Sequence, residues 1–124
     1  MIFNRLYKFG RTSFPDVLDR YSVEVHNREG WRGIPLAQDY TVKVLWSKWV
    51  TLAEAIEAER WFKQNYPKSF FTETNYNGIT ECRNWTPQQS YSFFDTLQKK
   101  FPKDQTSDEA LHKIYYILLT KKQA

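Results

Sequence analysis

The segment "YKFGRTSFPDVLDRY", Tyr7–Tyr21, carries the signals that decide how this chain folds. Its apolar and aromatic start is typical of a strand, and we expect that strand to end at Gly10. Ser13 and Asp16 follow in the spacing of a helix N-cap and its capping box. The segment therefore predicts a strand, a turn and a helix that carries Arg20.

Two other segments have the composition of strands. Residues 40–50, "YTVKVLWSKWV", are mostly β-branched or aromatic, and their alternation predicts that Val42, Val44 and Trp46 share one face. Residues 78–85, "GITECRNW", form a second candidate strand.

Three further helices are expected after the first. Thr51 and Thr86 are N-cap residues in front of helical patterns at 52–66 and 87–101, and a proline follows each pattern. A last helix is predicted from Ser107 to Leu119. The fold class is α/β or α+β, with a small mixed sheet of three to four strands flanked by helices.

Length and composition favour a single domain. The chain has 124 residues, so we expect a core domain over 1–102 with the C-terminal helix of 103–124 packed on it. No apolar run is long enough to cross a membrane, which predicts no membrane partner. The one cysteine, Cys82, fits a reducing cytoplasm and is interpreted as a buried core thiol. The net charge of +4 permits a polyanionic partner such as DNA.

Glu59 is an acid within an apolar helical stripe. An inward carboxylate loses hydration unless a cation or hydrogen-bond donors compensate. One interpretation is a position at the rim of the core, or a structural ion pair with Arg20 or Arg11. The other is a carboxylate that binds a divalent cation, with Glu57 as the alternative if the helix is rotated. The stripe consists of Leu52, Ala55, Ile56, Phe62 and Tyr66.

Cations alternate with aromatic rings in the segments "NREGWRG" and "VKVLWSKW". Rings that stack on bases and cations that contact phosphates are both used in nucleic-acid binding. The alternative is a solvated loop beside a strand with one buried face. The candidate nucleic-acid-binding residues are Arg28, Trp31, Arg32 and Lys43.

The segments "YKFGRTS", "AEAIEAERWF" and "GITECRNW" together resemble the GIY-YIG nuclease superfamily. The similarity is greatest to its small phage-borne branch, in which a Lys-Ile-Gly-Arg-Thr type of motif replaces Tyr-Ile-Gly, and it covers Arg5 to Phe101. The resemblance implies a GIY-YIG-like fold and an endonuclease that hydrolyses DNA with a single Mg²⁺ or Mn²⁺. It also implies a phage origin and a location in the cytoplasm of the host cell.

The resemblance assigns roles to individual residues. Glu59 matches the glutamate that binds the metal, which is also the residue selected by the helical-face argument. Arg20 matches the arginine of the first helix, and Arg11 extends from the glycine turn, so both would stabilise the phosphate. Lys8 stands in place of the second-motif tyrosine, and either Lys8 or Tyr7 would lie beside the attacking water.

Departures from the family pattern leave alternatives open. The Gly-Ile-Tyr motif has no counterpart before residue 5, and Tyr21 or His26 would have to replace the missing tyrosine. A catalytically inactive module on the same fold, binding nucleic acid or a host protein, is therefore the second hypothesis. In a phage accessory or inhibitory protein, the helix Ser107–Leu119 would either dock a partner or pack on the sheet.

Overall fold

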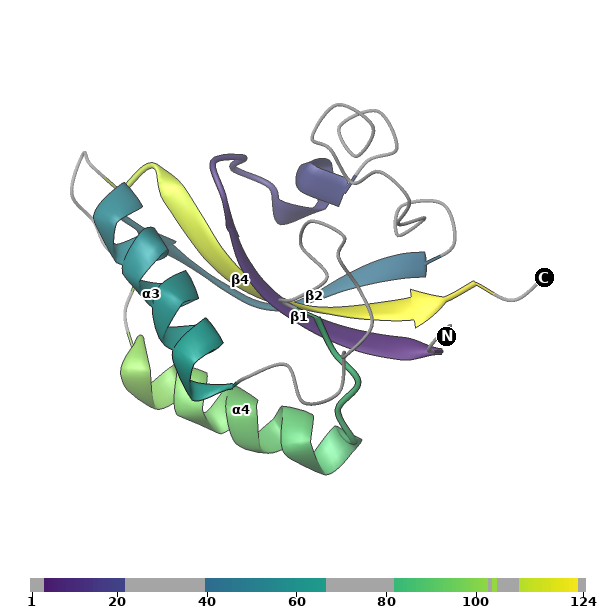
Figure 1. Ribbon diagram of the computed structural model, residues 1–124. Coiled ribbons are helices and arrows are strands. Elements are labelled where there is room, and N and C mark those ends of the chain that lie inside the picture. The colour runs from purple at the N-terminus through teal and green to yellow at the C-terminus, as the bar shows by residue number, and fades with distance from the viewer. Residues whose placement is uncertain (1–3, 22–39, 67–81, 103, 105–109, 123–124) are drawn as a thin grey trace.

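Figure 1 shows the protein as a computed structural model, which describes residues 4–21, 40–66, 82–102, 104 and 110–122. These residues form a small α+β fold, as predicted. Its elements in chain order are β1 (Arg5–Thr12), the 3-10 helix η1 (Val17–Tyr21), β2 (Tyr40–Val50), α3 (Leu52–Asn65), β3 (Cys82–Arg83), α4 (Pro87–Lys100) and β4 (His112–Lys121).

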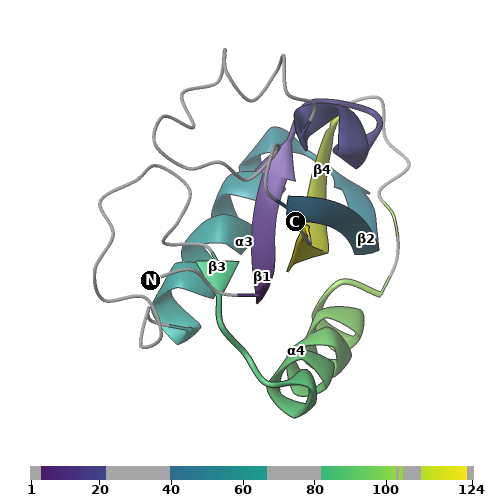
Figure 2. The ribbon, with the colours of Figure 1, turned by 90° about the vertical axis from the view of Figure 1, so that its right-hand side faces the viewer.

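The four strands form one sheet in the order β2-β4-β1-β3. Each of the three strand pairs is antiparallel, so the sheet is antiparallel and not mixed as predicted. Seen from its end in Figure 2, the sheet has β2 at one outer side and the short β3 at the other. The predicted size of the sheet is confirmed, and its inner strands are β4 and β1.

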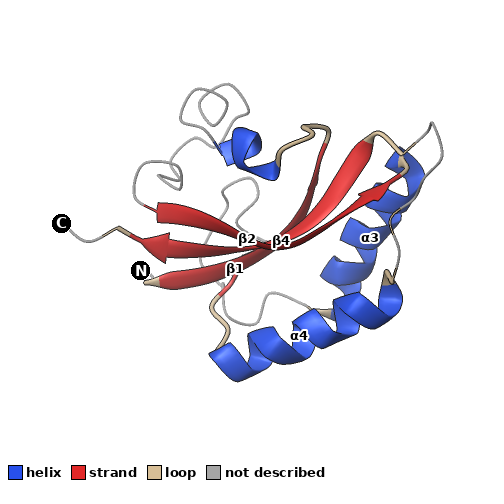
Figure 3. Ribbon diagram, turned by 180° about the vertical axis from the view of Figure 1, so that it is seen from behind, coloured by secondary structure: helices blue, strands red, loops and turns tan. Residues whose placement is uncertain are grey.

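The sheet has a different cover on each face. Helices α3 and α4 lie on one face, here called the helix side, and η1 lies on the opposite face, here called the η1 side (Figures 1 and 3). The helix side carries the larger core, in which Tyr7 and Phe9 of β1 and Tyr116 of β4 pack on aromatic residues of the two helices. The core on the η1 side consists of Leu6, Val17, Tyr40, Tyr115, Ile117 and Leu119.

Two of the three predicted N-caps, Thr51 and Thr86, are confirmed. The Thr51 hydroxyl accepts the Glu54 N–H at 3.2 Å, and the Glu54 carboxylate accepts the Thr51 N–H at 3.0 Å. Thr86 and Gln89 exchange the same two bonds at the start of α4. Each capping box satisfies N–H groups that the helix itself leaves without acceptors, so these starts are encoded locally.

The helix predicted from Ser107 to Leu119 is wrong, because residues 112–121 form the strand β4. This strand is covered on both faces of the sheet, and its residues from Ile114 to Ile117 are all buried. A strand buried on both faces shows a continuous apolar run and no alternation. Such a run cannot be told from a buried helix by its pattern alone.

The prediction that β1 ends at Gly10 is also wrong. The strand continues to Thr12, and Gly10 lies opposite Tyr115 of β4. A glycine within a strand leaves space beside its backbone for a bulky cross-strand neighbour, here a tyrosine.

The α-helix expected after Ser13 is replaced by the five-residue 3-10 helix η1. Two side chains bond to the backbone just before and within it. Thr12 Oγ1 accepts the Phe14 N–H at 3.1 Å, and Asp16 Oδ1 accepts the Leu18 N–H at 3.0 Å. Such local bonds offer the backbone an alternative to a regular α-helix.

Strand β2 has the predicted bounds, but the prediction that Val42, Val44 and Trp46 share one face is wrong. Its register shifts between Val44 and Trp46. Val42 and Val44 therefore pack on the η1 side, whereas Trp46 packs on the helix side. An extra residue in one strand reverses the alternation beyond it, because side chains alternate with a period of two.

Several predicted features lie outside the described residues. They are the loop residues His26, Arg28, Trp31 and Arg32, and residues 78–81 of the predicted strand. No helix in the described part of the chain is long and apolar enough to cross a membrane.

Candidate functional site: the Arg11–Glu59 pair

An ion pair joins the second half of β1 to the middle of α3. Arg11 Nε donates to Glu59 Oε1 at 3.3 Å. The side chains are 38% and 20% exposed, so the pair lies at the rim of the core and within reach of a ligand. The structure thus brings together two residues that the resemblance assigned to phosphate and metal binding. It also contains the structural ion pair that was the alternative interpretation of Glu59.

The orientation of α3 explains why Glu59 is at the rim. The buried residues of this helix are Ala55, Ala58 and Phe62. Leu52 and Ile56, both predicted to face inward, are 46% and 37% exposed. The buried stripe is therefore rotated towards Ala58, and Glu59 borders it because consecutive helical residues are about 100° apart.

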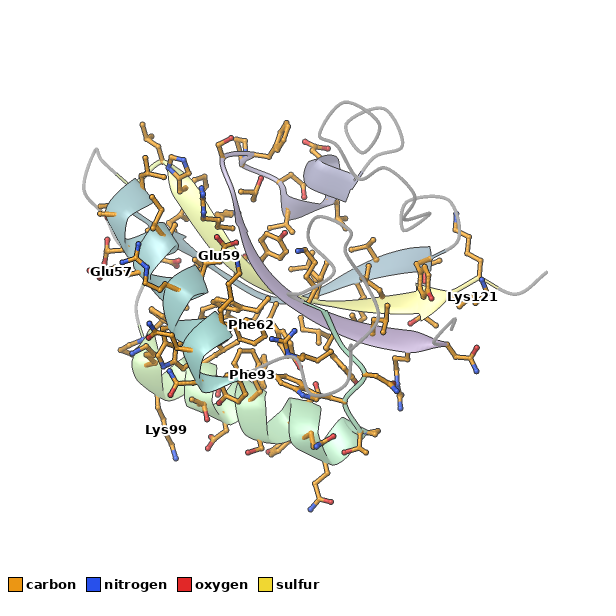
Figure 4. The ribbon with its side chains drawn as sticks, in the orientation of Figure 1. Glu57, Glu59, Phe62, Phe93, Lys99 and Lys121 are labelled. Atoms are coloured by element: carbon orange, nitrogen blue, oxygen red, sulfur yellow. The ribbon has the colours of Figure 1, made fainter. Side chains whose placement is uncertain are left out.

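Glu57 lies on a different face of α3 from Glu59, as Figure 4 shows, and it is exposed. It therefore does not share the ion pair with Arg11. Of the two glutamates considered from the sequence, Glu59 is the one that forms the ion pair with Arg11.

Tyr7 and Lys8 lie on opposite faces of β1, as strand alternation predicts. Tyr7 belongs to the helix-side core, where its ring stacks on that of Tyr116 with centroids 5.8 Å apart. Lys8 lies on the η1 side, opposite Ile117, and is 2% exposed. Arg11 is two positions on from Phe9 and shares its face. The structure therefore separates Lys8 from Arg11 and Glu59 by the thickness of the sheet.

Arg20 is part of η1, but its side chain lies outside the described part of the structure. Val17, the first residue of η1, packs in the η1-side core, so the backbone of η1 lies on that side of the sheet. Tyr21 is likewise a residue of η1 whose side chain is not described.

Two tyrosines of β4 occupy positions that the sequence reasoning missed, because it assigned them to a helix. Tyr115 lies opposite Gly10 on the same face as Lys8, and it is 1% exposed. Tyr116 lies on the helix side and shares a 2.6 Å hydrogen bond with Ser90. The segment that carries them, "KIYYILL", pairs antiparallel with β1.

Tyr116 is unsuited to act as a base. Burial raises the pKa of its hydroxyl far above the ordinary value of 10.0, and this effect exceeds the opposing effect of the Ser90 hydrogen bond. A group that must lose a proton near neutral pH needs the opposite shift. Tyr116 is therefore interpreted as a structural residue of the core.

Lysines lie against aromatic rings at several places on the surface. Lys100 Nζ is 4.9 Å from the centroid of the Trp61 ring, and Lys113 Nζ is 4.6 Å from that of Trp49. Lys43, the described member of the predicted nucleic-acid-binding set, is exposed on β2. Cations beside half-buried rings are compatible with a polyanionic ligand, although such pairs also occur as ordinary surface packing.

Among the residues that the structure describes, Glu59 is the candidate carboxylate ligand for a metal at this site. Among the described residues, no three His, Cys, Asp or Glu side chains gather into a group that could hold an ion. Mg²⁺ keeps several waters and often binds through one or two carboxylates together with substrate phosphates. Within the described part of the chain, Glu59 would be the carboxylate that holds such an ion, with water and phosphate oxygens as the further ligands.

Comparison with known proteins returns no match: no family model, no curated protein and no solved structure is significantly similar to this chain.

Proposed function

We propose that this chain is a divergent GIY-YIG-type endonuclease that hydrolyses phosphodiester bonds in DNA with Mg²⁺ or Mn²⁺. The observation that carries the proposal is the Arg11–Glu59 pair, which joins the arginine that the resemblance assigns to the phosphate to a carboxylate at a partly exposed rim. These two residues are 48 positions apart in the sequence.

The chemistry of the two side chains suits this reaction. A guanidinium has five N–H donors, so its bond to Glu59 leaves it able to contact a phosphate oxygen. Arg11 would then neutralise the charge that develops on the phosphate in the transition state. A carboxylate has about four acceptor positions on its two oxygens, so the bond to Arg11 is compatible with metal binding by Glu59. The metal would supply Lewis-acid stabilisation of the phosphate oxygens.

Nicking of a supercoiled plasmid with Mg²⁺ or Mn²⁺ tests this proposal. We expect the wild type to nick the plasmid and Glu59→Gln to lose activity by about a hundredfold or more, as for other groups that stabilise the transition state. Glu57→Gln is the matched control, because Glu57 is an exposed glutamate on another face of the same helix. Wild-type activity in Glu59→Gln, or its loss only in Glu57→Gln, would contradict the assignment.

A catalytically inactive nucleic-acid-binding module is the second candidate. The burial of Lys8 on the η1 side favours it, because the residue in place of the motif tyrosine is separated from the Arg11–Glu59 pair. The lysines against rings, such as Lys100 on Trp61, would then contribute to binding. If the chain is such a module, we expect that neither the wild type nor Glu59→Gln nicks the plasmid. We also expect its affinity for DNA to fall steeply as the salt concentration increases.

A further inference from the structure

Strand β2 forms an outer side of the sheet. Among the described residues, it pairs only with β4, and its other edge, here called the outer edge, carries no strand (Figure 2). Between its buried ends, each residue from Thr41 to Trp49 other than Trp46 keeps part of its side chain exposed. An edge of this kind presents backbone donors and acceptors that another strand can bind.

One backbone group of the outer edge already binds a carboxylate. Asp104, which lies between α4 and β4 in the chain, accepts the Trp49 N–H through Oδ1 at 2.9 Å. The Trp49 N–H therefore points away from β4. Backbone groups alternate between the two sides of a strand, so the Ser47 N–H points to the outer edge as well. Asp104 occupies a position that a carbonyl of an added strand would take.

The charges of β2 distinguish between possible partners. Lys43 and Lys48 both project from β2 on the helix side, on either side of Trp46, because their cross-strand neighbours Leu118 and Ile114 lie there. At the end of the strand, Lys113 lies over the Trp49 ring. A strand added at the outer edge would place its side chains next to these lysines.

A second copy of this chain is disfavoured as the partner. If two β2 strands paired antiparallel about their middle, Lys43 and Lys48 of one copy would lie beside those of the other. Like charges on neighbouring strands destabilise the pairing. Acidic side chains at the same positions would instead form favourable cross-strand pairs.

We propose that the outer edge of β2 binds an extended acidic segment of a partner protein as an added strand. The segment would displace Asp104 from Trp49, bond to the outward backbone groups at Ser47 and Trp49, and direct its carboxylates towards Lys43 and Lys48. The proposal uses neither Arg11 nor Glu59, so it does not depend on the proposed nuclease activity, although Lys48 and Arg11 flank Ile114 on the same face of the sheet.

The test uses the full chain and a decapeptide of alternating glutamate and valine, with the lysine–valine decapeptide as its charge control. Binding is followed by the backbone amide signals of the ¹⁵N-labelled protein. We expect the glutamate peptide to shift amide signals of residues 40–50 and the lysine peptide to shift none. No shift with the glutamate peptide, or equal shifts with both peptides, would overturn the proposal.

Variants at Ser47 separate strand addition from simple charge attraction. Proline at an edge position removes an outward N–H and leaves the bonds to the neighbouring strand intact. Ser47→Pro should therefore weaken peptide binding about tenfold, while Ser47→Val, which keeps the N–H, should bind like the wild type. Thermal unfolding of each variant shows whether it is folded. Equal affinities of folded Ser47→Pro and Ser47→Val would overturn strand addition.

Two further variants test the charges. Asp104→Ala removes the internal occupant and should tighten binding of the glutamate peptide. The double variant Lys43→Glu/Lys48→Glu should transfer the preference to the lysine peptide. Displacement of the glutamate peptide from the β2 amides by a single-stranded oligonucleotide would assign the surface to nucleic acid instead. Concentration-dependent self-association that Ser47→Pro abolishes would assign it to a second copy.

Discussion

Phe93 lies at the centre of the aromatic core, and its removal should be the most damaging single substitution in α4. The side chain is 1% exposed and its ring centroid is 4.9 Å from those of Tyr66 and Tyr116. Figure 4 shows it between the helices and the sheet, close to Phe62, whose ring is 5.3 Å away. Phe93→Ala removes a buried ring and leaves a cavity among its neighbours.

The magnitude follows from that environment. A buried Phe→Ala change costs about 3–5 kcal/mol, and loss of favourable ring pairs places Phe93→Ala near the upper end, at about 4–5 kcal/mol. Domains of this size are stable by about 5–15 kcal/mol, so the variant should be close to the limit of folding. Phe93→Leu keeps most of the volume and should cost only about 1–2 kcal/mol, so it remains measurable.

Urea unfolding, monitored by circular dichroism, measures these differences in the free energy of unfolding. Tyr91→Ala is the matched control, because Tyr91 lies two residues earlier on α4 and is 78% exposed. Its free energy of unfolding should change by less than about 0.5 kcal/mol. A cost below about 2 kcal/mol for Phe93→Ala, or an equal cost for Tyr91→Ala, would refute the central position of Phe93 in the core.

The remaining predictions concern the helix caps, the buried tyrosine and the ion pair. Thr51→Ala and Thr86→Ala should each lower the unfolding free energy by about 1 kcal/mol in urea titrations, because each removes a capping box, and unchanged midpoints would contradict the capping bonds. Burial raises the pKa of Tyr116 in the folded state, so its contribution to stability should be complete below about pH 10 and decline above it, where the unfolded chain loses the proton. In thermal unfolding at a series of pH values, Tyr116→Phe should reduce this loss of stability at high pH. If the loss is the same in the variant, other groups cause it. Arg11→Ala should cost less than about 1 kcal/mol of stability, because the pair with Glu59 is partly exposed, and a larger loss in urea would show a structural role.

Local signals predicted helices α3 and α4 well. The starts of α3 and α4 follow from Thr51 and Thr86, whose side chains bond to backbone groups three residues away. Such interactions depend on the sequence around the helix start and need no tertiary contact. The bounds of β2 were predicted for a similar reason, since its composition of β-branched and aromatic residues is distinct from that of its neighbours.

The errors in β1, β2 and β4 arise where distant segments decide the structure. β4 is a strand because β1 and β2 bond to its two edges, and Gly10 continues β1 because Tyr115 lies opposite it. The bulge in β2 likewise reverses Trp46 relative to Val44. None of these pairings can be recognised from a single segment, because a short apolar run is compatible with either a helix or a strand.

The candidate site was predicted in part. The apolar stripe of α3 drew attention to Glu59, and the neighbouring Arg11 was one of two arginines considered as its partner. Only the packing of α3 beside β1 determines which arginine contacts it. Alternation along β1 correctly separated Tyr7 from Lys8, but the burial of Lys8 depends on the cover of the η1 side, which the sequence pattern does not show.

The position of β4 between β1 and β2 has a consequence for synthesis of the protein. Residues 5–12 and 40–50 leave the ribosome first, yet in the finished sheet they have no direct bonds to each other and both pair with residues 112–121. The sheet therefore cannot close until the last of these three segments is made. Until then β1 and β2 lack their common neighbour, and exposed strand edges of this kind promote aggregation. A chain that terminates before residue 112 should accordingly be recovered as insoluble or degraded material, and this liability originates in the order of the strands.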